Sequence, residues 1–313
     1  MLKRVVVLTG PTATGKTELG VLLARECGAE IISADSMQIY RHMDVGTAKP
    51  TREEMGGVAH HMLDVASPLE AYSVARYSAE AARAADDIIS RGRLPMIVGG
   101  SGLFIDSLIA GREFAPEDTV GLRAEISEEY DRLGGEKMLE KLAEFDLESA
   151  GRLSARDKKR VVRAYEVYRL TGETISGHDT DSKSAPPRYE ALYIELGFSD
   201  RNALYARIDG RVDEMIKRGF QEEVRALMDM GLTKWHNSAQ AIGYREMLEA
   251  ELGEITPEQA RETTKRRSRQ YAKRQLTWLR RRRDALRINR SAAPDHSEEV
   301  RVSTEYMRRA GYI

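Results

Sequence analysis

The sequence has few of the features that mark secreted or membrane proteins. Its one cysteine, Cys27, excludes an internal disulfide and any zinc site built from several cysteines, and we expect it to be a small buried thiol. No apolar stretch approaches the roughly 20 residues that a membrane-spanning helix needs. Residues 1–4 lead directly into an apolar run and leave no room for a cleavable signal. We therefore expect a cytoplasmic protein without a membrane segment.

Charge of the two signs is balanced over the whole chain but not along it. The formal net charge is -1, which alone argues against a nucleic-acid partner. Between residues 261 and 290, however, 13 Lys and Arg residues stand against two acidic ones, a local net charge of +11. Most charged runs are only solvated surface, but a segment of nearly one sign is typical of polyanion binding. We expect this segment to bind nucleic acid.

One glycine-rich segment predicts phosphate binding. Directly after the apolar run at 5–8, the chain reads Gly10, Pro11, Thr12, Ala13, Thr14, Gly15, Lys16 and Thr17. This is the G-x-x-x-x-G-K-[ST] pattern, with a strand predicted before it and a helix after it. Its glycines let backbone N–H groups point inward, Lys16 adds a positive charge, and the Thr17 hydroxyl is placed to bind Mg²⁺. The pattern predicts a site for linked phosphates without saying which molecule carries them.

Alternating strand and helix patterns in the first hundred residues predict an α/β core. Short apolar runs indicate buried parallel strands at 5–9, 31–34 and 96–98, and helical patterns lie at 18–27 and 74–90. In the first helix we expect three leucines to face inward: Leu19, Leu22 and Leu23. The alternation predicts a doubly wound sheet with its ligand site at the carboxyl ends of the strands, where the phosphate loop, Asp35 and Ser101 all fall.

The character of the sequence changes near residue 113. Residues 113–187 are predicted to form a helical insertion, and residues 1–112 plus 188–313 the core. Within the insertion, the helix at 158–170 has an apolar stripe made of Val161, Ala164, Tyr165 and Tyr168. An apolar run at 191–196 is assigned to the original sheet. Everything from residue 201 onward is expected to be helical, in segments at 208–230, 239–252 and 257–287.

Three polar positions have more than one interpretation. Asp35 could bind Mg²⁺, accept a proton from a nucleophile, or cap the next helix. Arg207 and Arg211 share a helix face and suit phosphate oxygens, but they could equally form a solvated face paired with acidic neighbours. At His60-His61 we expect no metal site, because adjacent side chains point apart and no cluster of ligands surrounds them.

The basic segment at 265–280 combines charge with helical spacing. Ala272, Leu276 and Leu279 form a seam that can dock on the body of the protein. The remaining circumference is expected to be basic, with Tyr271 and Trp278 interleaved. We expect this helix to bind nucleic acid through residues such as Lys273 and Arg274.

Several segments taken in order resemble the tRNA dimethylallyltransferases, over nearly the whole chain. The matching segments are GPTATGKT at 10–17, SADSMQIY at 33–40, MDVGTAKP at 43–50, HHMLD at 60–64, VGGSGL at 98–103, RVVRAYEV at 160–167, AIGYR at 241–245 and AKRQLTWL at 272–279. The resemblance implies a P-loop NTPase-like core with a helical insertion and a helical C-terminal region. It also implies transfer of a dimethylallyl group from dimethylallyl diphosphate to the exocyclic N6 amine of the tRNA adenosine on the 3′ side of the anticodon.

The resemblance also implies roles for particular residues. The phosphate loop would hold the diphosphate of the prenyl donor, with Mg²⁺ on Thr17; Asp35 would be the general base, and Arg211 would stabilise the diphosphate. The positions implied to contact tRNA are Asp35, Ser36, Met37, Gln38, Ser101, Arg123, Lys159, Arg160, Val161, Val162, Arg163, Gln240, Ala241, Ile242, Gly243, Tyr244, Arg245, Lys273 and Arg274.

Two further expectations complete the sequence-based hypothesis. Some eukaryotic relatives carry a zinc-binding extension, which a single cysteine cannot build, so a bacterial-type protein is implied, and we expect a monomer. The alternative consistent with the phosphate loop and an acid at a strand end is a small-molecule kinase or ATPase.

Overall fold

A parallel sheet organises the larger part of the computed structural model, which describes residues 2–112, 114, 121–177, 186–282, 284–291 and 294–313. The chain divides into two compact units, Met1–Gly111 with Arg188–Ile313, and Arg112–Pro187. Within the described residues of the first unit the sheet has six strands in the order β3-β2-β4-β1-β5-β6. Their bounds are β1 Lys3–Thr9, β2 Glu30–Ser33, β3 His60–His61, β4 Pro95–Gly99, β5 Tyr189–Phe198 and β6 Leu286–Arg290.

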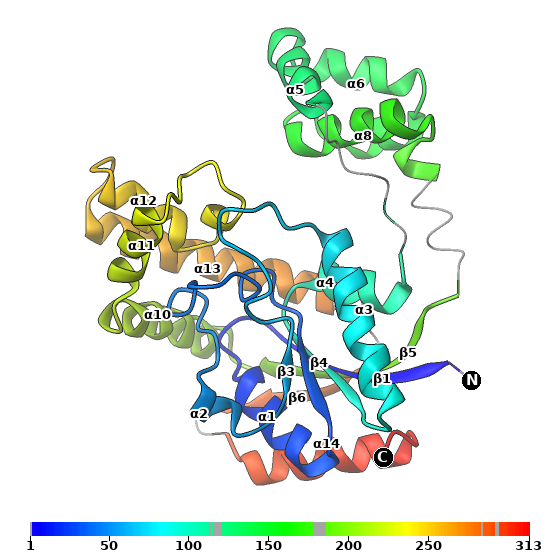
Figure 1. The fold of residues 1–313 in the computed structure, drawn as a ribbon, viewed down its shortest axis with the longest axis vertical. Helices are drawn as coiled ribbons and strands as arrows, with labels where there is room; N and C mark the ends of the chain where they lie inside the picture. The colour runs from blue at the N-terminus through cyan, green and yellow to red at the C-terminus, as the bar shows by residue number, and fades with distance from the viewer. Residues whose placement is uncertain (1, 113, 115–120, 178–185, 283, 292–293) are drawn as a thin grey trace. The chain divides into compact units, whose positions relative to one another are not determined.

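Alternate residues of β1 enter two hydrophobic layers, one on each face of the sheet. Val5 and Val7 pack with residues of α3 (Val74–Ser90), α4 (Gly102–Ala110), α11 (Phe220–Asp229) and α12 (Tyr244–Glu251). Val6 and Leu8 pack with residues of α1 (Lys16–Cys27) and α14 (His296–Arg309). Figure 1 shows helices on both faces. This arrangement is the predicted doubly wound α/β fold. The short helix α2 spans Arg52–Met55.

A group of helices follows β5 in the same unit. They are α10 Arg201–Lys217, α11 Phe220–Asp229, the short 3-10 helix Ser238–Gln240, α12 Tyr244–Glu251 and α13 Pro257–Leu279. Thr256 and Gln259 form a capping box that begins α13, with Pro257 in its first turn. The predicted single helix over 208–230 is two helices, because Gly219 adopts a left-handed conformation with φ 91° between α10 and α11.

The prediction that everything after residue 201 is helical is wrong at one strand. Helix α13 ends at Leu279, not near residue 287, and β6 then pairs in parallel with β5, with Leu286 opposite Ile194. The strand sequence LRINR has no continuous apolar run, because β6 lies at the edge of the sheet and its exposed positions are polar. An edge strand of this kind lacks the pattern used to recognise buried ones.

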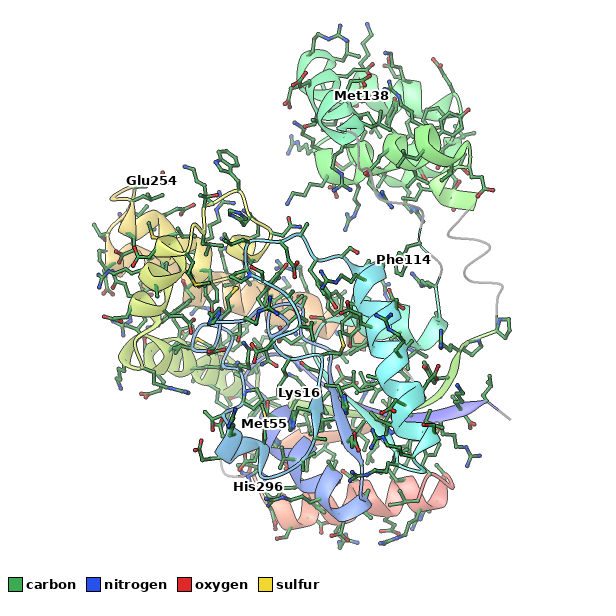
Figure 2. The ribbon with its side chains drawn as sticks, viewed as in Figure 1. Lys16, Met55, Phe114, Met138, Glu254 and His296 are labelled. Carbon is green, nitrogen blue, oxygen red and sulfur yellow. The ribbon has the colours of Figure 1, made fainter. Side chains whose placement is uncertain are left out.

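The second unit is a bundle of short helices, α5 Leu122–Leu133, α6 Gly135–Ala143, α7 Leu147–Arg152 and α8 Lys158–Thr171. Ile126, Met138, Leu142 and Val161 are fully buried in its core, and Met138 is labelled in Figure 2. Tyr168, predicted to belong to the apolar stripe of α8, is instead 36% exposed and stacks on Phe145.

Two smaller predictions also need correction. In α1, Leu22 is only half-buried, and Val21 takes its expected place in the core. Cys27 is likewise half-buried rather than enclosed. In the described part of the chain, no helix combines the length and the apolarity needed to cross a bilayer.

Candidate active site

The phosphate loop between β1 and α1 depends on its two glycines. Gly15 has φ 79°, and a Cβ there would collide with the Arg290 guanidinium; a Cβ on Gly10 would collide with the Leu196 carbonyl oxygen. Ala13 also has a positive φ of 65°, an uncommon conformation for a residue with a side chain. Inside the loop, the Thr14 hydroxyl donates to the Pro11 carbonyl at 2.8 Å. The conformation of the loop therefore depends on small residues at these positions and on its own internal hydrogen bonds.

Lys16 hydrogen-bonds to carbonyl groups of its own loop, and its surroundings lower the pKa of its ammonium group. Its Nζ donates to the carbonyl oxygens of Gly10 at 2.9 Å and Pro11 at 2.6 Å. Burial, then the positive charge of Arg211, lower its pKa to about 7, with Asp35 acting in the opposite direction. An anion bound in the loop would restore the charged form, because opposite charge favours protonation.

Asp35 follows β2 at the carboxyl edge of the sheet, as predicted. Its Oδ1 accepts a hydrogen bond from the Met37 N–H at 2.9 Å, but a turn and not a helix follows, so the carboxylate stabilises that turn and does not cap a helix. The Ser101 hydroxyl oxygen accepts from the Ser36 N–H at 3.0 Å. These bonds fix the direction of the carboxylate, which lines a cavity with Lys16 and remains available for chemistry.

Arg207 and Arg211 approach the site from α10. Arg211 lines the cavity and donates to the Thr47 carbonyl at 3.3 Å; burial lowers its pKa and Asp35 opposes that effect. Arg207 is exposed, its guanidinium lies over the Phe198 ring, and its Nε donates to the Ala13 carbonyl at 3.1 Å. The helix face that Arg207 and Arg211 share is therefore directed at the rest of the protein and is not only solvated. Arg211 lines the cavity, and Arg207 hydrogen-bonds to the phosphate loop.

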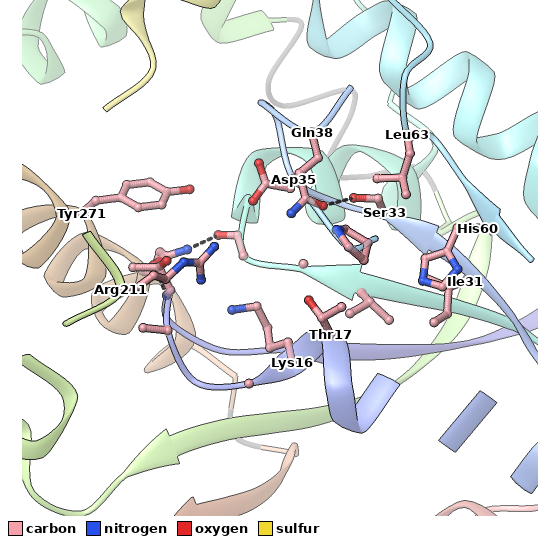
Figure 3. Close-up of a pocket in the computed structure, with 18 residues that line it drawn as sticks. Lys16, Thr17, Ile31, Ser33, Asp35, Gln38, His60, Leu63, Arg211 and Tyr271 are labelled. Carbon is pink, nitrogen blue, oxygen red and sulfur yellow. Dashed lines mark hydrogen bonds between the residues drawn. The ribbon is translucent and has the colours of Figure 1, made fainter. Parts of the chain in front are cut away.

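Two cavities meet beside these residues. The first, about 110 Å³, contains the loop residues Gly15, Lys16 and Thr17, and Figure 3 shows Lys16, Thr17, Asp35 and Arg211 around it. The second, about 310 Å³, has apolar walls from α10 and the segment before α12, including Ile208, Val212, Met215 and Ile242. Both are lined by Thr12, Ala13, Asp35, Arg211 and Tyr271. A carboxylate and a guanidinium therefore lie where a phosphate-binding cavity opens into a larger one.

The residues present suit a magnesium ion held mainly by a ligand. Among the described residues no group of three or more His, Cys, Asp or Glu side chains could hold a metal ion alone. Mg²⁺ in phosphate sites keeps several waters and takes only one or two protein ligands, the remainder coming from substrate phosphates. The Thr17 hydroxyl and the Asp35 carboxylate line the same cavity and offer such ligands.

Comparison with known proteins decides the family. The model of the family described as IPP transferase matches residues 38–282. The chain belongs to the IPP transferase family. This family member is 44% identical over 281 residues to a tRNA dimethylallyltransferase of Caldanaerobacter subterraneus subsp. tengcongensis, covering 89% of each chain. It is 42% identical over 308 residues to that of Acetivibrio thermocellus, covering 97% of each.

Solved structures that resemble this chain are also tRNA prenyltransferases. The full-length tRNA isopentenylpyrophosphate transferase from Bacillus halodurans superposes with a TM-score of 0.73 at 37% identity, covering 99% of this chain and 96% of that one. A eukaryotic dimethylallyltransferase acting on tRNA superposes with a TM-score of 0.83 at 26% identity, covering 98% and 80%. The predicted resemblance and the P-loop NTPase-like fold class are confirmed.

The positions predicted to contact tRNA fall into separate groups. Lys159, Arg160, Arg245, Lys273 and Arg274 are exposed. Four others line the second cavity and are partly buried: Ser36, Met37, Gln240 and Ile242. Gln38 is buried and donates to the carbonyls of Thr47 and Ala48, and Ser101 is buried against Ser36. In the insertion unit, Arg123 and Arg163 both pair with the buried Glu166 carboxylate.

Several other positions predicted to contact tRNA are buried. Val161 and Val162 lie in the hydrophobic core of the insertion unit, because they form the inner face of α8. Tyr244 is fully buried, and its hydroxyl donates to Glu223 at 2.6 Å. Ala241 and Gly243 are also buried, in the larger of the two units. Ala241 and Tyr244 nevertheless line the second cavity.

The basic helix α13 is less free than its sequence suggests. Lys265 pairs with Asp213 at 2.8 Å, Arg267 pairs with the buried Glu246, and Arg269 pairs with Asp209. Ala272 and Leu279 are buried as predicted. The two aromatic residues face the protein: Tyr271 lines both cavities, and the Trp278 indole donates to Asp106 at 2.7 Å.

Two residues that sequence reasoning missed contact the phosphate loop. Gln275 of α13 accepts from the Thr12 N–H at 2.9 Å, and Arg290 of β6 donates to the Thr14 carbonyl at 2.7 Å. The spacing of Gln275 from Ala272 and Leu279 places it on the buried seam, which was a usable signal. The sequence held no comparable signal for Arg290, because the strand β6 that carries it was not predicted.

Proposed function

We propose that this chain transfers a dimethylallyl group from dimethylallyl diphosphate to the exocyclic N6 amine of the tRNA adenosine on the 3′ side of the anticodon. The observation that carries the proposal is the position of Asp35 and Arg211 at the junction of the phosphate-loop cavity and the larger cavity. In this reaction a bond forms between N6 and the allylic carbon, the carbon–oxygen bond to diphosphate breaks, and the amine loses a proton. Those events require a cradle for the leaving group and a base beside it.

The phosphate-loop cavity supplies the donor half. The loop N–H groups, Lys16 and Arg211 would stabilise negative charge as it grows on the departing diphosphate. Lys16 would exchange its bonds to the Gly10 and Pro11 carbonyls for bonds to phosphate oxygens. When bound, Mg²⁺ on the Thr17 hydroxyl would supply further charge stabilisation to the same oxygens.

The larger cavity supplies the acceptor half. Its volume of about 310 Å³ and its apolar walls from α10 suit a planar base turned out of an RNA stack. The Asp35 carboxylate would accept the N6 proton as the new bond forms, and its bond from Met37 N–H keeps it aimed at the junction. Because the allylic carbon must lie between amine and leaving group, it would occupy the place where the cavities meet.

Exposed lysine and arginine side chains would bind the phosphate groups of the RNA. Lys273 and Arg274 of α13, with Arg274 also lining the larger cavity, would neutralise phosphates beside the entering nucleotide. Lys159 and Arg160 of the insertion unit offer a second basic surface. We further propose that the chain works as a monomer on cytoplasmic tRNA.

The decisive experiment measures transfer directly. The protein is incubated with Mg²⁺, labelled dimethylallyl diphosphate and unmodified tRNA carrying adenosine beside the anticodon; the matched control tRNA carries guanosine there. We expect label only in the adenosine tRNA. Absence of label in both would contradict the proposal, and ATP turnover without any prenyl donor would favour a kinase or ATPase.

A further inference from the structure

A buried glutamine joins the two loops that carry the site. Gln275 lies on α13 between the exposed Arg274 and the half-buried Leu276 and is itself only 6% exposed. Its Oε1 accepts from the Thr12 N–H of the phosphate loop at 2.9 Å, and its Nε2 donates to the Gly100 carbonyl after β4 at 2.9 Å. One amide group therefore uses its acceptor on one loop and its donor on the other.

The second loop leads to the proposed base. Ser101 follows Gly100, and its hydroxyl accepts from the N–H of Ser36, the neighbour of Asp35. A path of hydrogen bonds thus runs from the diphosphate loop through Gln275 to the turn that aims Asp35. Gln275 also lines the phosphate-loop cavity, together with Thr12, Gly100 and Asp35.

The local sequence is fitted to this amide. A Cβ on Gly100 would collide with the Gln275 Nε2, so only glycine leaves room for it. A side chain at position 275 must carry both a donor and an acceptor at the end of two methylenes, a combination that only glutamine provides. Without them the Thr12 N–H and the Gly100 carbonyl lose these hydrogen bonds in a buried setting, which is unfavourable.

We propose that Gln275 is a positioning residue that sets the distance between the diphosphate loop and the Asp35 turn. Its loss lets the loop move relative to the turn, so diphosphate is held less tightly and the leaving group is misplaced with respect to the base. The effect on transfer rests on the function proposed above, whereas the effect on diphosphate binding does not.

The test uses inorganic pyrophosphate with Mg²⁺ as the probe, measured by calorimetry on the full chain. Gln275→Met keeps length and volume but removes both bonds, and we expect pyrophosphate affinity to fall about tenfold. In transfer assays we expect KM for dimethylallyl diphosphate to rise similarly and kcat to fall, with KM for tRNA unchanged. Gln270→Met, at an exposed position of the same helix, is the matched control and should leave pyrophosphate affinity unchanged.

A second variant reaches the same contact from its other side. Gly100→Ala displaces the Gln275 amide without altering it, although the new Cβ also lies 3.2 Å from the Gly10 carbonyl oxygen, and Gly100 has no left-handed backbone conformation that alanine would strain. This variant should reproduce the loss of pyrophosphate affinity. If Gln275→Met does not fold, the Gly100→Ala result tests the positioning role in its place. Unchanged pyrophosphate affinity and donor KM in a folded variant would overturn the positioning role. Failure of the wild-type protein to modify tRNA would instead overturn the proposed function and leave the pyrophosphate comparison valid.

Discussion

Arg290 of β6 donates a hydrogen bond of 2.7 Å to the carbonyl of Thr14 and thereby supports the phosphate loop from behind. The guanidinium is held in turn by both carboxylate oxygens of Glu299 on α14, at 2.8 and 2.5 Å. Arg290 and Glu299 are 5% and 6% exposed. The loop therefore depends on an ion pair contributed by the last strand and helix of the described chain.

This pair should stabilise both the fold and the donor site. We expect Arg290→Met to lower the free energy of unfolding by about 3–5 kcal/mol, because the buried Glu299 carboxylate loses both guanidinium bonds and keeps His296 Nδ1 at 3.3 Å as a neighbour. The double variant Arg290→Met with Glu299→Leu should regain most of that stability in urea titrations but not pyrophosphate affinity, since the Thr14 carbonyl remains unsupported. Arg301→Met, which breaks an exposed pair with Glu298, is the control and should cost less than about 1 kcal/mol. Normal pyrophosphate binding by the double variant would show that Arg290 does not contribute to the donor site.

Asp35 should affect turnover far more than binding. Asp35→Asn keeps an oxygen for the Met37 N–H but cannot accept a proton, so we expect kcat to fall about 10²-fold or more. Binding of tRNA and donor, measured separately by filter retention and calorimetry, should be preserved. Asp229→Asn, at an exposed position on α11, is the control. A fully active Asp35→Asn protein would show that another group accepts the proton.

Donor binding should take up a proton above neutral pH. Burial lowers the pKa of Lys16 to about 7 in the free protein, so the side chain is largely neutral at pH 8 and must be recharged by bound diphosphate. Pyrophosphate affinity should thus be highest below pH 7 and fall as the pH rises. Calorimetry at pH 8 in buffers of different ionisation enthalpy should detect the uptake, and Lys16→Arg, which stays charged, should abolish it.

The same shift predicts the pH dependence of folding. The unfolded chain holds the Lys16 proton up to its ordinary pKa of 10.5, whereas the folded chain releases it near 7. Between these values the unfolded state binds more protons, so the Lys16 contribution makes the free protein more stable as the pH rises. Comparison of urea unfolding at pH 7 and pH 9 between wild type and Lys16→Met isolates this contribution. Equal pH slopes in both proteins would contradict it.

Charge reversal on α13 should weaken tRNA binding and flatten its salt dependence. Lys273→Glu with Arg274→Glu removes two exposed cations, and each lost phosphate contact reduces the salt slope by about one. Arg308→Glu with Arg309→Glu on α14 is the matched control: both arginines are exposed, and α14 packs on the other face of the sheet. An unchanged slope for the α13 pair would mean that RNA does not reach this helix.

Predictions from the sequence succeeded where a short segment contains its own determinants. The phosphate loop needs only its glycines, Lys16 and Thr17 in order, and Asp35 needs only a strand before it. They failed where exposure depends on distant packing. Tyr168 was predicted to belong to the apolar stripe of α8 but is 36% exposed, and β6 was missed because an edge strand has no continuous apolar run.

The amino-acid sequence by itself determined the doubly wound core, the phosphate loop and the acid at the end of β2, because backbone conformation and the burial of apolar residues act over a few residues. Only the tertiary structure decided what holds those parts together. Gln275 meets Thr12 across 263 residues of sequence, and Arg290 meets Thr14 across 276. Such contacts depend on where whole helices and strands pack, which no local pattern records.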